Sequence, residues 1–134
     1  MEINNITWQQ TIPLRQQVLW PTKPPEFCQV DGDEQALHFG AYLDNKIACV
    51  ASIYIDGDIA RLRKFATGEP FQGRGIGSAM ISHILVQLKN INTKIFWCDA
   101  RESAMSFYQR FGMKPMGKRF YKAEVSYFKM QVTL

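Results

Sequence analysis

The longest helical pattern of the chain follows a glycine-rich turn. Apolar residues recur at spacings of three and four, which places them on one helical face: Ile76, Met80, Ile81, Ile84, Leu85 and Leu88. Three glycines precede this face within residues 71–77, and residues 59–67 before them have strand character. The predicted order is strand, glycine turn and helix. The first turn of such a helix offers unpaired N–H groups and the positive end of the helix dipole to an anion.

Alternation of apolar and polar positions predicts an antiparallel meander before that turn. Residues 37–43 alternate, Asp44-Asn45 is typical of a hairpin turn, and residues 47–55 form the partner strand. Residues 56–58 turn again into the third strand, 59–67. There the alternation slips, because Leu62 and Phe65 are three positions apart, and a β-bulge near Lys64 would let both face the core.

The first 36 residues have a weaker pattern. A short strand is expected at residues 6–9, and Thr11 is expected to cap a helix over 14–20 that points Val18 and Leu19 inward. Prolines then end it and open a loop over residues 22–34, which contains four carboxylates: Glu26, Asp31, Asp33 and Glu34. This loop is either solvated surface or, at the mouth of a pocket, a selector of cationic amines. His38 is expected to be a hydrogen-bonded strand histidine rather than a catalytic one.

After the long helix, residues 94–99 are apolar enough to predict a buried parallel strand. A helix follows, with one face formed by Ala104, Phe107, Tyr108 and Phe111 and with Gly112 at its C-terminal end. Residues 118–121 and 125–132 predict a final hairpin. The fold class is therefore α/β, with a mixed, mostly antiparallel sheet.

Size and composition predict one globular domain covering residues 1–134. The sequence also predicts no bound metal. The 134 residues are 46% hydrophobic, and the formal net charge is +4. Because the basic residues form no run, a phosphorylated cofactor is favoured over nucleic acid. The three cysteines (Cys28, Cys49 and Cys98) are an odd number, widely spaced, and predict reduced buried thiols. The absence of a signal-peptide pattern and of a long apolar run predicts a cytoplasmic protein without membrane contact.

Two motifs resemble a known superfamily. Gln72-x-x-Gly75-x-Gly77 resembles the pyrophosphate loop of the GNAT N-acetyltransferases. The second motif, Ala100-Arg101-x-x-Ala104-x-x-Phe107-Tyr108-x-x-x-Gly112-Met113, resembles their second conserved block, and it follows in the right order. The resemblance is good from about residue 36 to the end. It implies a central sheet splayed between the fourth and fifth strands, with helices on both faces.

The same resemblance implies a binding site for acetyl-CoA as cosubstrate. The pantetheine arm would lie along the bulged strand at Phe65, Ala66 and Thr67. The pyrophosphate would meet the glycine loop, formed by Gln72, Gly73, Arg74, Gly75, Ile76, Gly77 and Ser78. Glycine there permits close approach, and Arg74 adds charge. The amine would attack the thioester directly, and a strand N–H would polarise the acetyl carbonyl.

Tyr108 matches the general acid of the superfamily, which protonates the leaving thiolate. The general base is open. Some relatives have a glutamate where this chain has Arg61, which leaves His38, Glu69, a loop carboxylate acting through water, or an amine that arrives neutral. Cys98 is favoured as a buried structural thiol over a nucleophile.

The predicted function is acetyl transfer from acetyl-CoA to a primary amine of a small molecule or peptide. The alternative is a protein that binds acyl-CoA without turnover. A basic nucleic-acid module is a third and weaker reading. The oligomeric state is left open, a homodimer included.

Overall fold

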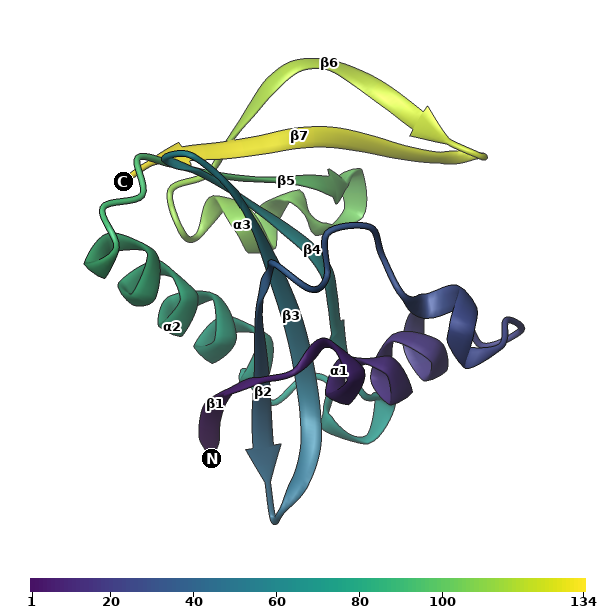
Figure 1. The fold of residues 1–134 in the computed structure, drawn as a ribbon. Helices are drawn as coiled ribbons and strands as arrows, with labels where there is room; N and C mark the ends of the chain where they lie inside the picture. The colour runs from purple at the N-terminus through teal and green to yellow at the C-terminus, as the bar shows by residue number, and fades with distance from the viewer. The chain divides into compact units, whose positions relative to one another are not determined.

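The structure is a computed structural model that describes all residues, 1–134. Seven strands form one sheet in the order β1-β2-β3-β4-β5-β7-β6, shown in Figure 1. The chain divides into two compact units. Unit 1 comprises Met1–Tyr54 and Leu62–Gln87, and unit 2 comprises Ile55–Arg61 and Leu88–Leu134. The mixed, mostly antiparallel fold class is confirmed, and the single domain over 1–134 stays a prediction.

The elements in chain order are β1 (Glu2–Ile6), α1 (Trp8–Leu14), the π-helix η1 (Arg15–Leu19), the 3₁₀ turn η2 (Pro25–Cys28), β2 (Leu37–Leu43), β3 (Lys46–Asp56), β4 (Ile59–Thr67), the 3₁₀ turn η3 (Glu69–Phe71), α2 (Ile76–Asn90), β5 (Ile95–Arg101), the 3₁₀ turn η4 (Glu102–Ala104), α3 (Met105–Gln109), β6 (Lys114–Lys122) and β7 (Val125–Thr133). No helix among them is long and apolar enough to span a membrane.

The predicted positions of the N-terminal strand and helix were wrong. The first strand ends at Ile6, and Thr7, not Thr11, caps the helix. The Thr7 hydroxyl accepts from the Gln10 N–H at 3.3 Å, while the Gln10 side chain accepts from the Thr7 N–H at 2.8 Å. This reciprocal capping box is readable as Thr-x-x-Gln and outweighs the proline signal on which the prediction relied. Pro13 lies inside α1, and the chain continues after Leu14 as the π-helix η1.

The meander prediction is confirmed in unit 1. β2 and β3 pair antiparallel, with His38 opposite Ser52 and Phe39 opposite Ala51. The turn residues Asp44 and Asn45 both have positive φ, as a tight hairpin turn requires.

Helices cover both faces of the unit 1 strands (Figure 1). On one face, Leu14 of α1 packs in a buried cluster with Val50 of β3 and Ala66 of β4, and the predicted inward residues Val18 and Leu19 lie against it. On the other face, His83 of α2 contacts Phe39 of β2, with ring centroids 5.7 Å apart. The apolar face of α2 is buried as predicted, with Leu85 half-buried.

The predicted interruption of β4 falls at Lys64, which has a left-handed backbone with φ +54°. A β-strand residue other than glycine rarely adopts this conformation. The Lys64 ammonium lies 4.4 Å from the centre of the Trp20 ring, a cation–π contact that helps to hold it. The predicted core partner was wrong, since Leu62 and Ala66 are buried while Phe65 is half-buried.

Unit 2 is built on β5. The first residues of β4 pair with it in parallel, Ile59 to Ile95 through Arg61 to Trp97. β7 pairs with the other side of β5 and with β6, antiparallel in both cases. The final hairpin is confirmed, with its first strand beginning four residues earlier than predicted, at Lys114.

One face of β5 is buried, not both as predicted. Phe96, Cys98 and Ala100 are at most 2% exposed, whereas Trp97 and Asp99 between them are half-buried. Apolar composition alone suggested a strand covered on both sides. Trp97 counts as apolar in such a pattern, but its ring here lies on the open face among charged groups.

Candidate functional site

The glycine loop forms a closed turn between β4 and α2, within unit 1. The Gln72 side chain donates to the Thr67 carbonyl at 3.0 Å, and the Phe71 N–H donates to the Gly68 carbonyl at 2.9 Å. The first intrahelical bond runs from the Ala79 N–H to the Gly75 carbonyl, at 3.1 Å. The segment from Phe65 to Ser78 is therefore the predicted strand, turn and helix start, held by its own hydrogen bonds.

Two glycines of this loop have conformations that L-residues avoid. Gly73 has φ +74° and Gly75 has φ +78°, and no atom lies within 4 Å of where a Cβ would be placed on either. The space in front of both is open, and Gln72 to Gly75 are exposed. A loop with this backbone at a helix start can bring N–H groups close to a phosphate.

Thr67, at the end of β4, is half-buried. Its hydroxyl hydrogen-bonds Cys49, whose thiol pKa is raised by burial to about 11. The Thr67 side chain and carbonyl thus each have a hydrogen-bond partner within the protein, Cys49 and Gln72.

Tyr108 lies in α3 of unit 2 and is 9% exposed. Its side chain hydrogen-bonds Cys98, whose thiol pKa is raised to about 12 chiefly by burial, a rise that this hydrogen bond partly offsets. A thiol that stays protonated is a poor nucleophile, in agreement with the structural role predicted for Cys98. The tyrosine side chain thus has a hydrogen-bond partner within the protein.

A buried ionic network in unit 1 was not predicted from the sequence. Arg15 and Asp33 form a bidentate pair at 2.7 and 3.0 Å, and both side chains are 0% exposed. Arg15 also donates to Ser52 Oγ at 2.8 Å, and Tyr54 donates to the Asp33 carboxylate. Burial alone would raise the pKa of Asp33, but the hydrogen bonds from Arg15, Tyr54 and Val30 lower it further, so the carboxylate is charged.

Asp33 therefore corrects the prediction for the acidic loop. It is neither solvated nor free to bind an amine, because its charge is balanced by Arg15. Glu26, Asp31 and Glu34 are exposed, as expected of that loop.

His38 belongs to the same network and is 4% exposed. Its Nε2 lies 2.8 Å from the Asp33 carbonyl, which can only accept, so Nε2 bears the proton. Its Nδ1 then accepts from Ser52 Oγ at 2.7 Å. Burial lowers the pKa of His38, against the opposing effect of the Asp33 carbonyl. The expected hydrogen-bonded strand histidine is confirmed, and neither ring nitrogen is free to act as a base.

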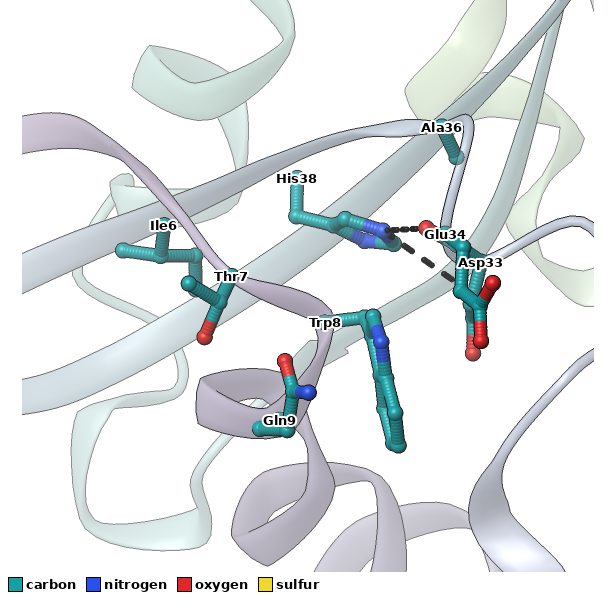
Figure 2. A pocket seen from close by; sticks show the side chains of 8 residues that line it. All are labelled: Ile6, Thr7, Trp8, Gln9, Asp33, Glu34, Ala36 and His38. Atoms are coloured by element: carbon teal, nitrogen blue, oxygen red, sulfur yellow. Dashed lines mark hydrogen bonds and ion pairs between the residues drawn. The ribbon is translucent and has the colours of Figure 1, made fainter.

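A pocket of about 460 Å³ opens beside this network, within unit 1. It is lined by Ile6, Thr7, Trp8, Gln9, Asp33, Glu34, Ala36 and His38. In the view of Figure 2, Ile6 and Thr7 lie on the left, Asp33 and Glu34 on the right, Trp8 and Gln9 below, and His38 above with its ring toward Asp33 and Glu34. Because Asp33 is neutralised by Arg15, Glu34 is the lining residue that supplies net negative charge.

Only some of the residues predicted to form the active site lie in the same unit. The loop and strand residues predicted for the cofactor lie together in unit 1, and Tyr108 lies in unit 2. The partners of Asp33 were missed, because Arg15 and Asp33 are 18 positions apart and nothing in their spacing links them.

Comparisons with known proteins agree with this fold. Residues 23–134 match the family model described as an acetyltransferase (GNAT) domain. The chain is 27% identical over 129 residues to the uncharacterized N-acetyltransferase YitI of Bacillus subtilis (strain 168), covering 90% of this chain and 87% of that protein.

Solved structures show the same fold at low sequence identity. The ribosomal-protein-S18-alanine N-acetyltransferase of Escherichia coli superimposes with a TM-score of 0.83 at 18% identity, over 98% of this chain and 92% of that one. A GNAT family acetyltransferase from Elizabethkingia anophelis with acetyl-CoA bound superimposes with a TM-score of 0.77 at 17% identity, over 99% and 97%.

The mixed sheet with its parallel β4–β5 pair thus has the fold of these acetyltransferase structures. With a family match over residues 23–134, the chain belongs to the GNAT family of acetyl-CoA-dependent N-acetyltransferases. The family match begins 13 residues before the point from which the motifs alone gave a good resemblance.

Proposed function

We propose that the chain binds acetyl-CoA through Gln72–Ser78 and the backbone of Phe65–Thr67, and transfers its acetyl group directly to a primary amine. The observation that supports this assignment most is the pair of left-handed glycines with open space before them, at the start of a 15-residue helix. Anion binding by such a turn needs no bound metal. Arg74 lies at the same turn, with its guanidinium 5.9 Å from the centre of the Phe71 ring, and adds positive charge.

Replacing Gly75 with Asp tests the cofactor site. The substitution places a side chain and a negative charge in the open space, so acetyl-CoA affinity measured by calorimetry should fall at least about tenfold. Gly57→Asp is the matched control, since Gly57 also has positive φ (+62°) and open space, but in the β3–β4 turn. Equal loss in both variants would reduce the effect to backbone strain and overturn the assignment.

Tyr108 is proposed as the general acid that protonates the leaving thiolate. A phenol and a thiol have ordinary pKa values of about 10 and 8.5, close enough for proton transfer between them. Tyr108 is 9% exposed, and its side chain hydrogen-bonds Cys98.

The test is Tyr108→Phe, which keeps the ring and removes the proton donor. Turnover should fall by about 10²–10⁴-fold with little change in acetyl-CoA affinity. Cys98→Ala removes the hydrogen-bond partner without removing the acid, and it should retain most of the turnover. If Cys98→Ala reproduces the loss, Tyr108 acts through packing and not as an acid. If acetyl-CoA binds and no amine of a broad panel is acetylated, the protein is an acyl-CoA-binding protein without turnover.

The acceptor is proposed to be an amine of a small molecule or peptide that enters as a cation. The pocket beside α1 supports this, because Glu34 provides an unbalanced carboxylate and Trp8 an aromatic ring, and the two together favour an ammonium group. Glu34→Gln should raise KM for a cationic acceptor about two- to fivefold and leave KM for acetyl-CoA unchanged. Glu26→Gln, on the same loop but outside the pocket lining, is the control. An unchanged acceptor KM in Glu34→Gln would assign the acidic loop to solvated surface.

We also propose a cytoplasmic location. All three cysteines are buried and free, as is usual for proteins of a reducing compartment. Fractionation of cells that express the tagged full chain tests this location.

A further inference from the structure

β4 leaves its neighbour β5 partway along its length. The parallel pairing of the two strands extends from Ile59 to Arg61, and the residues of β4 after Arg61 belong to unit 1. This second part contains Phe65–Thr67, the backbone proposed above to lie along acetyl-CoA. Because β5 does not pair with this part of β4, its direction depends on contacts within unit 1.

Lys64, directly before that segment, has a strained backbone. Of the non-glycine residues with positive φ, Lys64 (φ +54°) is the one that lies inside a strand, while the others lie in turns. A lysine has no short polar side chain that could stabilise this conformation locally, as asparagine or aspartate can. Strain of this kind persists where the surrounding structure holds it, and it is common at functional sites. Lys64 therefore needs contacts that hold it.

The ring of Trp20 supplies such a contact. The Lys64 ammonium lies 4.4 Å from the centre of this ring, and both residues are half-buried. A cation–π contact becomes stronger as water is removed from the cation. A regular extended backbone at residue 64 would turn the lysine side chain away from the ring. The contact therefore favours the left-handed conformation over the extended one.

Trp20 is itself fixed by the segment around η1. It is the C-cap residue of η1, and its N–H donates to the carbonyls of Arg15 and Gln16, at 3.2 Å in both cases. The Lys23 N–H donates to the Trp20 carbonyl at 3.1 Å, and the Gln16 side chain donates to the Lys23 carbonyl at 2.8 Å. The Phe27 ring packs edge-on against the Trp20 ring, with centroids 5.3 Å apart. The position of the Trp20 ring is thus supported by contacts other than Lys64.

We propose that Trp20 is a positioning residue for acetyl transfer: its ring holds Lys64 left-handed and thereby fixes the direction of the Phe65–Thr67 backbone against the thioester. The inference rests on the proposed function, in which this backbone carries the pantetheine arm and a strand N–H polarises the acetyl carbonyl. A donor that is already oriented needs no reorganisation when charge develops on the carbonyl oxygen. Glycine at position 64 would reach the same conformation without strain but would not be confined to it.

The first measurement uses the full chain without cofactor. The NMR chemical shifts of the Lys64 Cα and Cβ carbons distinguish a left-handed from an extended backbone. In Trp20→Leu these shifts should move toward extended values, because the extended conformer then competes. In Trp20→Phe, which keeps a ring, they should stay close to those of the wild type. Phe27→Leu is the matched control, since it removes the neighbouring ring and keeps the Lys64–Trp20 contact, and it should leave the shifts unchanged.

The second measurement is turnover under conditions where chemistry limits the rate. The acceptor is the amine that the wild type acetylates fastest in a panel of polyamines, amino acids and aminoglycosides. In Trp20→Leu, kcat should fall about tenfold, because only molecules with a left-handed Lys64 are competent. The Kd for acetyl-CoA should change less than about threefold, since the pyrophosphate loop is unaltered. Phe27→Leu should keep kcat within about twofold of the wild type.

A double-mutant cycle separates positioning from packing. In the Lys64→Gly background residue 64 reaches the left-handed conformation without the ring, so adding Trp20→Leu should lower kcat by less than about twofold. An equal loss in both backgrounds would overturn the proposal, because Trp20 would then act on its own loop and not through Lys64. Unmoved Lys64 shifts in Trp20→Leu would overturn it as well. A wild type that acetylates no amine would overturn the proposed function, whereas full kcat in Trp20→Leu would overturn the positioning role alone.

Discussion

Two arginine–aspartate pairs in this protein have similar N···O distances and different surroundings. In unit 1, Arg15 and Asp33 are 2.7 Å apart with both side chains 0% exposed. In unit 2, Arg61 and Asp99 are 3.0 Å apart with side chains 32% and 18% exposed. Further hydrogen bonds surround the buried pair: Arg15 donates to Ser52 Oγ, and the Tyr54 hydroxyl and the Val30 N–H donate to the Asp33 carboxylate. The exposed pair shares its carboxylate with a third charge, Lys122.

The comparison shows that burial, more than distance, decides what an ion pair does. A buried charge that loses its partner cannot be rescued by water, so each member of the buried pair depends on the other. Water screens the exposed pair, which leaves its cations available for other anions. The Arg15–Asp33 pair stabilises the fold beside the pocket, whereas the Arg61–Asp99 pair lies at the protein surface.

The largest effect is expected for the buried pair. Asp33→Asn keeps the side-chain shape and leaves Arg15 charged and unbalanced, so the free energy of unfolding in urea should fall by about 3–5 kcal/mol. The exposed neighbour Asp31→Asn is the control and should change stability by less than about 0.5 kcal/mol. Adding Arg15→Met to Asp33→Asn should recover part of the loss, because the unpaired charge is then gone. Similar stability of Asp33→Asn and wild type would contradict the role of the pair.

A smaller, pH-dependent effect is expected from His38. Its pKa is lowered in the folded state, so below about pH 6.5 the unfolded chain binds more protons than the folded one. Stability should therefore be full above that pH and should fall as the pH drops through the folded-state pKa. Each unit of pKa difference is worth about 1.4 kcal/mol.

Urea unfolding at pH 5 and pH 7.5 measures this dependence. His38→Gln should have a weaker pH dependence than wild type between those values, although it is less stable overall. His83→Gln changes the other histidine and should keep the wild-type dependence. A His38→Gln variant with the wild-type pH dependence would assign the titration to other groups.

The smallest effect is expected for the exposed pair. Asp99→Asn should lower the free energy of unfolding by no more than about 1 kcal/mol, since both partners are partly solvated. A loss as large as that of Asp33→Asn would erase the distinction between the two pairs.

Local patterns in the sequence determined much of the fold. The helical face from Ile76 to Leu88, the hairpin at Asp44-Asn45 and the terminal hairpin were readable because each depends on neighbours within a few positions. The interruption at Lys64 was readable from a slip in alternation. The glycine loop was readable because its spacing matches a family motif, and that match, not periodicity, suggested the cofactor residues. Their roles and that of Tyr108 remain predictions.

Only the tertiary structure decided which polar residues are buried. Asp33 stands in the sequence among three other loop carboxylates, and nothing local separates it from Asp31 or Glu34. Its burial depends on Arg15, 18 positions earlier, and on Ser52 and Tyr54 from β3. The open face of β5 was hidden for the same reason, because a strand of apolar composition does not show which of its faces a helix will cover. Burial depends on distant parts of the chain meeting, and no local pattern contains that information.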